Sequence, residues 1–479
     1  MSSRPSFGER HLGTVDLGDR RRNERLPQLV DEMVRHPGGT LPQKLPRTAD
    51  RDAFYHLCRV EEVTHAAVLA PHRAQTLQSL QSTRKNLLVV HDATEFDFST
   101  RTSLKRLGQI GNGNGRGYIA HQSLVVDPRA GTLVGLAHQI LHTRAAVPKR
   151  ESVAAKRKRE SRESRLWLQG TEGLPARRQV VDVCDRGADT FEFLEHEVRS
   201  GRTFVIRACH DRMIQPGHED PAAKKKSLFA YARAQPALGT SEACVPLPAR
   251  QREKTAAGLP ASRIARLQLS RAPIRVFPPH VRRGAHGKEP LTMWVVRIWE
   301  PEPPEGCEPL EWLLLTNHAR EDAPLKAARE VKTWYEWRWV VEEYHKGQKT
   351  GCGLEQLQLR EEERLEPALA ILSIVALTLL KLRDAVRDPQ LGSRRADEVV
   401  DPEAIRILSQ WHCGRPCPAW TLYEYTLALA QLGGYRPRKN APPGWQVLWR
   451  GQTKLELMRD GARIIQELSR EGPKKCARR

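Results

Sequence analysis

The stretch TWYEWRWVVEEYHKGQKTG, residues 333–351, carries the sharpest pattern in the chain. An α-helix advances by roughly 100° per residue, which places Glu343 about 100° away from Glu342. The side chains that share one narrow face of this helix are Tyr335, Arg338, Glu342 and Lys349, with Lys346 close to them. Arg, Lys and Tyr all donate hydrogen bonds to phosphate oxygens, so an acid among them is typical of a metal ligand beside phosphate-binding groups. The alternative is an exposed helix whose charges form ordinary ion pairs one turn apart.

Two further acids follow predicted strands. Residues 86–91 (NLLVVH) form one strand and lead into Asp92, and residues 179–184 (QVVDVC) form another and lead into Asp185. The ends of strands in an α/β sheet present functional side chains, because the backbone there is fixed while the side chain emerges at an edge. We therefore expect Asp92 and Asp185 to join Glu342 in one site.

The acids next to these positions are assigned other roles. Glu95 and Asp97 are expected in the turn beyond the first strand. Asp182 precedes Asp185 by three positions, so the two side chains point to opposite faces of the strand. Asp189 has the spacing of a helix N-cap followed by Glu192, which favours a capping box over a metal ligand.

Clustered carboxylates of this kind suit phosphodiester chemistry. Two divalent ions roughly 3.5–4 Å apart can activate an attacking oxygen and stabilise a leaving one. Hard cations prefer oxygen ligands, so Asp92, Asp185 and Glu342 predict two Mg²⁺ or Mn²⁺ ions in each active site. The ligand types alone do not separate the two metals.

Composition points to a polyanionic partner. The 479 residues include 78 Lys and Arg against 57 Asp and Glu, a net charge of +21, and such an excess favours nucleic acid. A membrane partner is not predicted, because no long Lys-rich amphipathic helix occurs and the apolar run Ala368–Leu380 is too short to span a bilayer. The first residues carry no secretory signal and the nine cysteines form no framework, so a cytoplasmic location is expected.

The patterning along the chain predicts a protein with both helices and strands. Helices are expected at about 18–36 and 50–77, at Lys149–Arg165, and as one long helix from about Leu325 to Thr350. The glycine-rich segment GNGNGRG (111–117) is followed by a strand pattern, so it predicts a hairpin loop and not a nucleotide site. Residues 212–300 alternate short strand patterns with Pro, Gly and basic residues, which indicates a β-rich insertion.

The pattern Tyr335-x2-Arg338-x3-Glu342-x6-Lys349 resembles the Tyr-Arg-Glu-Lys signature of the insertion-sequence-four family of bacterial DDE transposases. VVHDATEF and VCDRGADTFEFL resemble the motifs around the family's first and second Asp. Other matching segments are LGDRRRNERL, FYHLCR, EWLLLT, ALAQLGGY and PPGWQVLWRG. These segments run over nearly the whole chain in the family's order.

The resemblance implies an α/β fold with a ribonuclease-H-like catalytic core at 76–370, containing the β-rich insertion at about 212–300. A helical domain that binds the DNA end would occupy 1–75, and a helical dimerisation domain would occupy 371–479. Asp92, Asp185 and Glu342 would be the catalytic, metal-binding triad. The residues implied to bind DNA are Tyr335, Arg338, Lys349, Trp312, Arg186, Arg207, Arg25 and Arg59.

Trp312 would stack against a flipped base at the cut, since stacking replaces what an extruded base loses. Its alternative role is that of an ordinary core tryptophan. The chain departs from the family at Gln356 and Gln358, where arginines are expected, which puts phosphate contacts there in doubt.

The activity implied by the resemblance is cut-and-paste transposition of double-stranded DNA: strand nicking, hairpin formation, hairpin opening and strand transfer by a homodimer bound to two transposon ends. One alternative is a ribonuclease-H-like nuclease that cuts without joining. Another is a catalytically silent DNA-binding protein, such as a transposition inhibitor. An RNA-binding protein is disfavoured by the lack of an aromatic RNP-like stretch.

Overall fold

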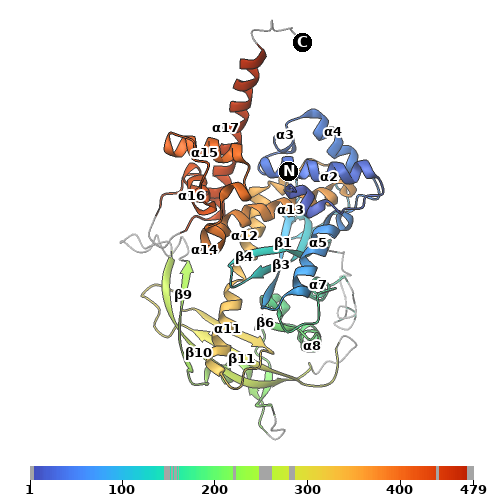
Figure 1. The fold of residues 1–479 in the computed structure, drawn as a ribbon. Coiled ribbons are helices and arrows are strands. Elements are labelled where there is room, and N and C mark those ends of the chain that lie inside the picture. Colours follow the sequence, from blue (N-terminus) through green and yellow to red (C-terminus); the bar gives the residue numbers. More distant parts are fainter. Residues whose placement is uncertain are drawn as a thin grey trace.

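The computed structural model describes residues 5–144, 152, 155, 159, 161–218, 223–246, 262–279, 286–437 and 442–471 (Figure 1). The charge-dense segment Lys149–Arg165, expected to be a helix, lies mostly outside the described residues; its last part forms a short 3₁₀ turn, η1 (Glu163–Arg165).

The chain begins with five helices: α1 (Phe7–Leu12), α2 (Arg20–Arg35), α3 (Leu41–Lys44), α4 (Thr48–Leu57) and α5 (His65–Ser82). Side chains cap the start of α1, α2 and α5, because the first turn of a helix has free backbone N–H groups. Asp19 accepts hydrogen bonds from the N–H groups of Arg21 and Arg22 at the start of α2. Thr64 caps α5, so the single helix expected over 50–77 is two helices with a turn between them.

The strands form one mixed sheet. They are β1 (Leu87–Asp97), β2 (Gly108–Ile110), β3 (Gly115–Asp127), β4 (Thr132–His142), β5 (Val180–Cys184), β6 (Thr203–Arg207), β7 (Met213–Pro216), β8 (Lys226–Ser227), β9 (Gly239–Pro246), β10 (Ser262–Val276), β11 (Leu291–Trp299) and β12 (Glu311–Thr316). The order of the described strands is β2-β3-β1-β5-β6-β12-β11-β10-β7-β8, with β4 also paired to β3 and β9 to β10. The pairs β1–β5 and β5–β6 are parallel, and the other pairs are antiparallel.

The strand β1 is longer than the sequence predicts. It pairs in parallel with β5 only from Leu87 to His91, but its antiparallel pairing with β3 continues to Asp97. Asp92 therefore lies inside β1, and the expectation that Glu95 and Asp97 occupy a turn is wrong. The long partner β3 supplies hydrogen bonds beyond the end of β5, which keeps β1 extended.

The glycine-rich segment forms the expected hairpin: residues 111–114 turn between β2 and β3. The described residues of 212–300 form β7 to β11 and the helix α9 (Leu228–Arg233), and these strands continue the same sheet. Two further helices, α7 (Leu166–Gly170) and α8 (Phe191–Arg199), and a 3₁₀ turn, η2 (Arg186–Ala188), lie on either side of β5 in the sequence.

The long helix expected from Leu325 to Thr350 is broken. α11 (Pro324–Glu336) ends in a turn at Trp337 and Arg338, α12 (Trp339–Lys346) follows, and a π-helical turn, η3 (Gly347–Gly351), completes the segment. A short 3₁₀ turn, η4 (Leu354–Gln356), leads to the C-terminal part of the chain.

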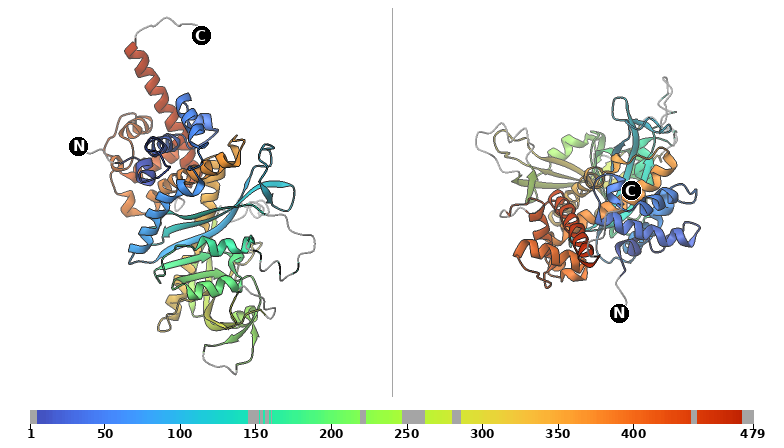
Figure 2. Two further views of the ribbon diagram at one scale, coloured as in Figure 1. Left: turned by 90° about the vertical axis from the view of Figure 1, so that its right-hand side faces the viewer. Right: turned by 90° about the horizontal axis from the view of Figure 1, so that it is seen from above.

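The rest of the chain is helical: α13 (Glu362–Arg387), α14 (Pro389–Gly392), η5 (Ala396–Glu398), α15 (Pro402–Cys413), α16 (Leu422–Leu432) and α17 (Trp445–Glu471). Figures 1 and 2 show the N-terminal and C-terminal helices together at one end of the molecule and β9 to β11 at the other. The predicted domain boundaries near 75 and 370 fall inside α5 and α13.

The helix α13 lies at the centre of the molecule. It packs on α5 and β4, and its apolar residues join the N-terminal helices and the sheet in one core. Among the described residues, α13 is long and apolar enough over Glu362–Val386 to cross a membrane, although the run Ala368–Leu380 within it is shorter than a membrane-spanning helix needs. However, 81% of its most apolar window is buried inside the protein, as in a core helix.

Candidate active site

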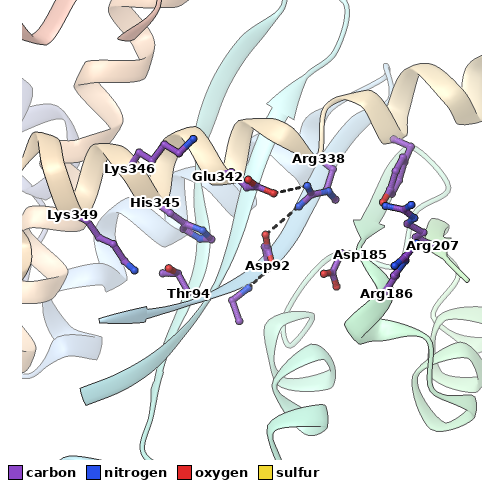
Figure 3. Close-up of a pocket in the computed structure, with 12 residues that line it drawn as sticks. Asp92, Thr94, Asp185, Arg186, Arg207, Arg338, Glu342, His345, Lys346 and Lys349 are labelled. Atoms are coloured by element: carbon purple, nitrogen blue, oxygen red, sulfur yellow. Dashed lines mark hydrogen bonds and ion pairs between the residues drawn. The ribbon is translucent and has the colours of Figure 1, made fainter. Parts of the chain in front are cut away.

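One pocket of about 490 Å³ opens where β1, β5 and β6 face α11, α12 and η3 (Figure 3). We call it the Asp92 pocket. Its lining is Asp92, Ala93, Thr94, Asp185, Arg186, Arg207, Tyr335, Arg338, Glu342, His345, Lys346 and Lys349. It brings together the three acids expected from the sequence and most of the expected DNA-binding residues.

The parallel pairing of β1 with β5 places Asp92 and Asp185 side by side. The last paired residues are His91 and Cys184, so each acid is the next residue along its strand. One Asp92 oxygen accepts a hydrogen bond from the N–H of Ala93 (2.8 Å), and Asp185 accepts one from the N–H of Gly187 (2.7 Å). Each carboxylate thus has one oxygen held by backbone near the mouth of the pocket.

Arg338 connects the other two acids. Its Nη1 lies 3.3 Å from Asp92 Oδ2, and its Nη2 lies 2.5 Å from Glu342 Oε1 (Figure 3). The residue sits in the turn between α11 and α12, where the break directs its side chain between the strand and the helix. Glu343, by contrast, faces α13 and pairs with Arg383, as the helical spacing predicts.

The pKa of Asp92 is unusually high for an acid beside an arginine. Burial and then the neighbouring Asp185 raise the pKa of Asp92 to about 7, and Glu342 adds to this effect. The hydrogen bond from Ala93 and the charge of Arg338 lower the pKa of Asp92, but they do not offset the increase. Burial and the neighbouring acids therefore outweigh the effect of Arg338 on the carboxyl group of Asp92.

Such a donor set fits a hard divalent cation. All three acids offer carboxylate oxygens, which Mg²⁺ and Mn²⁺ prefer, and a cation beside Asp92 would oppose the rise in its pKa that burial and Asp185 cause. In the described part of the chain, however, no three His, Cys, Asp or Glu side chains are gathered closely enough to hold an ion. Glu342 turns to Arg338, and Asp185 turns to the N–H of Gly187.

Positive charge surrounds the acids. The cationic side chains in the lining are Arg186, Arg207, Arg338, Lys346 and Lys349. Cations thus outnumber the three acids, which favours a phosphate-bearing ligand. Lys349 also lies 3.7 Å from Glu355, and Arg207 donates a 3.4 Å hydrogen bond to the backbone oxygen of Glu311.

Two buried polar groups also line the pocket. The Tyr335 hydroxyl has no hydrogen bond of good geometry to a described residue, although the side chain of Arg207 is close to it. Burial raises the pKa of Tyr335. Burial, with Lys349 and Arg338 nearby, lowers the pKa of His345 to about 3, so this imidazole is neutral at pH 7. The sequence analysis missed His345, although its position three residues after Glu342 could have indicated it.

Trp312 does not line the pocket. It lies on β12, half-buried, with its ring centroid 5.2 Å from that of Tyr335 in an edge-on arrangement. Trp312 therefore packs against the ring of Tyr335 in this structure. The role of base stacking stays a prediction.

The neighbouring acids lie away from the pocket. Asp182 is fully buried, where it accepts hydrogen bonds from His91 (2.8 Å) and Arg202 (2.5 Å). The capping role expected of Asp189 is wrong, because Thr190 caps α8. Asp189 is instead buried and accepts hydrogen bonds from two backbone N–H groups at residues 209 and 210.

The two predicted N-terminal arginines lie far along the chain from the pocket residues. Arg25, on α2, donates to Asp50 on α4 (2.5 Å) and is half-buried. Arg59 follows α4 and is exposed.

A comparison with known protein families identifies this N-terminal region. Residues 4–63 match the family model described as transposase DNA-binding. The match covers α1 to α4 and includes Arg25 and Arg59. It supports a transposase role for the chain and DNA as its partner.

Proposed function

We propose that this protein is a DDE transposase that moves DNA by cut-and-paste transposition. The observation that carries the proposal is the Asp92 pocket, which three carboxylates and five cationic side chains line. The match of residues 4–63 to a transposase DNA-binding model supports the same conclusion from a separate part of the chain.

Asp92, Asp185 and Glu342 would hold two Mg²⁺ or Mn²⁺ ions. When bound, these ions would activate the attacking oxygen and stabilise the leaving oxygen of a phosphodiester. The protein's own contribution is to position DNA. Arg186, Arg207 and the two lysines of α12 and η3 would bind phosphate oxygens near the cut, since they line the same pocket as the acids.

Tyr335 and Arg338 have distinct tasks in this proposal. The buried Tyr335 hydroxyl would donate a hydrogen bond to a DNA phosphate, which would satisfy a group that the described protein leaves without a formed hydrogen bond. Arg338 holds Asp92 and Glu342 next to each other through one guanidinium group. A neutral residue there would leave the two acids to repel each other.

The order of strands supports a ribonuclease-H-like core. The strands β4, β3 and β1 form an antiparallel meander, and β5 and β6 continue in parallel from β1. Two of the acids follow the paired segments of β1 and β5, and the third lies on the later helix α12. In this proposal β7 to β11 are an insertion between the second and third acids.

The C-terminal helices would form the dimer contact of the synaptic complex. The helix α17 projects past the rest of the molecule (Figure 1) and exposes Leu457, Ile464, Ile465 and Leu468. Exposed apolar side chains spaced along one helix are typical of a protein–protein contact. A dimer bound to two transposon ends would cover them.

The experiment that tests the proposal compares the wild type with Glu342→Gln and Glu343→Gln on DNA that carries the element's own ends. Each protein is incubated with and without Mg²⁺, and nicks, hairpins and joined products are separated on a denaturing gel. The expected result is Mg²⁺-dependent hairpins and joined products from the wild type and Glu343→Gln only.

Glu343→Gln is a matched control because it neutralises the adjacent acid, which faces Arg383 and not the pocket. Circular dichroism checks that both variants fold. Cleavage without joining by the wild type would favour the nuclease alternative. If all three proteins bind DNA but none cleaves it, the silent DNA-binding protein would be favoured. Retention of cleavage by Glu342→Gln would refute the assigned triad.

A further inference from the structure

A second cavity lies beside α13, between the N-terminal and the C-terminal helices. It has a volume of about 620 Å³ and is lined by α1 and α2, by the start of β4, by α13, and by α14 to α17. We call it the junction cavity. Its volume is within the range of small-molecule sites, roughly 300–1,000 Å³. It shares no lining residue with the Asp92 pocket.

The acids of the junction cavity already have partners. Asp31 accepts a hydrogen bond from the N–H of Gly8 (2.7 Å), and Asp384 accepts one from the N–H of Leu133 (2.7 Å). Arg459 pairs with the other two acids in the lining, Asp401 and Glu456. Asp384 also pairs with Arg383 (3.0 Å), so three of the four acids in the lining are in ion pairs.

Two cations in the lining have no such compensation. Lys381 on α13 and Arg10 on α1 both line the cavity, and no ion pair among the described residues includes either of them. The remaining arginines of the lining do pair, Arg35 with Glu32 (2.8 Å) and Arg394 with Glu398 (2.9 Å). An unpaired cation in a partly enclosed site is costly, and a bound anion would relieve that cost.

The environment of Lys381 supports the same conclusion. Burial and then the charge of Arg10 lower the pKa of Lys381 to about 8, although Asp384 acts in the opposite direction. Two neutral histidines lie close by: burial lowers the pKa of His11 to about 3 and that of His72 well below its ordinary value, and Lys381 adds to both effects. Burial is the first cause of all three shifts, and the further effect of Lys381 on both histidines shows that these groups lie close to one another.

The rest of the lining is largely apolar. The residues that supply this surface include Phe7, Val34, Leu391, Val400, Leu422 and Tyr425. An apolar wall with a small number of charged groups is the usual composition of a site for an amphipathic small molecule. A free inorganic anion would leave this wall without a partner.

We propose that the junction cavity binds a small amphipathic anion, whose acidic head group contacts Lys381 and Arg10 and whose apolar body packs on the surrounding helices. The ligand would touch both the N-terminal helices that match a transposase DNA-binding model and the C-terminal helices. This site does not depend on the proposed catalytic function, because it is separate from the Asp92 pocket.

The test is isothermal titration of the full-length protein with decanoate, acetate and decanol. Decanoate carries both the acidic head group and the apolar body. Acetate carries only the acidic head group, and decanol carries an apolar body with a neutral head group. We expect saturable binding of one decanoate, with acetate and decanol at least about tenfold weaker, because each loses one class of contact.

Two variants locate the ligand. Lys381→Gln and Arg10→Gln should each weaken decanoate binding by about tenfold, the value of one charge-assisted contact. Lys326→Gln removes an exposed lysine outside the cavity and should leave the affinity unchanged. Arg10 is exposed, so its substitution keeps the test valid if Lys381→Gln fails to fold.

Three results would overturn the proposal. They are the absence of saturable decanoate binding, equal binding of decanol and decanoate, and equal loss of affinity in Lys326→Gln and the two cavity variants. The last would mean that decanoate responds only to the overall positive charge. None of these titrations contains DNA or Mg²⁺, so their failure leaves the transposase proposal untouched.

Discussion

Replacing Asp92 by Asn is expected to stabilise the protein at pH 8 more than at pH 5 when divalent metal is absent. The pKa of Asp92 is raised from 3.8 to about 7 in the folded protein. Between these values the folded state keeps a proton that the unfolded state has released. The contribution of Asp92 to the free energy of unfolding is therefore fully present below pH 3.8 and is lost as the pH rises from 3.8 to about 7. Above pH 7 this contribution changes no further.

The size of the effect follows from the same shift. Each pKa unit corresponds to about 1.4 kcal/mol, so the full difference between 3.8 and 7 is about 4 kcal/mol. The part that falls between pH 5 and pH 8 is about 3 kcal/mol. Only 16% of the Asp92 side chain is exposed, so solvent screens the effect little. Asn resembles the protonated acid and does not titrate.

Urea unfolding at pH 5 and pH 8 in EDTA measures this difference for the wild type and Asp92→Asn. Asp97→Asn, on the same strand, is the control: Ser99 lowers the pKa of Asp97, so its effect on stability should be constant over this range. Mg²⁺ should then raise the stability of the wild type at pH 8 but not that of Asp92→Asn. A constant stability difference between the wild type and Asp92→Asn from pH 5 to pH 8 would refute the argument from crowded, buried charge.

Three further predictions concern other parts of the molecule. Gly451→Ala should cost about 1–3 kcal/mol of stability in urea unfolding, because a Cβ there would collide with a backbone oxygen of the facing helix α16. In the same assay, Asp189→Ala should lower stability by about 3–5 kcal/mol, because it breaks a buried ion pair with Arg212. Thr190→Ala should lower stability by about 1 kcal/mol, because it removes only a helix cap. A larger loss of stability in Thr190→Ala than in Asp189→Ala would contradict this assignment of the cap. Arg25→Gln and Arg59→Gln should each weaken binding to the element's end in fluorescence anisotropy and reduce the slope of log affinity against log salt by about 1; an unchanged slope would mean that neither contacts phosphate.

The sequence predicts the positions of the strands well but not how far each one extends. The apolar residues before Asp92 and Asp185 mark the buried, parallel-paired parts of β1 and β5 correctly. The local sequence pattern of β1 does not indicate the length of its neighbour β3. That strand pairs with β1 as far as Asp97. Strand ends depend on partners distant in the sequence, so periodicity alone places them poorly.

The broken helix shows the same limit in a different form. The helical wheel assumes one continuous helix through residues 333–351, yet a turn at Trp337 and Arg338 separates α11 from α12. The predicted side chains still line one pocket. Across the break the backbone makes hydrogen bonds three residues apart, from Arg338 to Tyr335 (3.0 Å) and from Val340 to Trp337 (3.0 Å), which keeps the chain close to a helical path.

The charges of the pocket distinguish the two roles that the sequence leaves open for this helix. If Arg338 and Glu342 belonged to an ordinary surface helix, their pair would be exposed and the nearby acid would have a lowered pKa. Instead the Arg338 side chain is only 13% exposed, and the pKa of Asp92 is raised although Arg338 contacts it. Asp92 and Arg338 are largely shielded from solvent, and two further acids and four further cations line the same pocket, which is typical of a binding site and not of a solvated helix face. In the proposed function, a phosphodiester and its metal ions would supply the negative and positive charges that such a pocket binds.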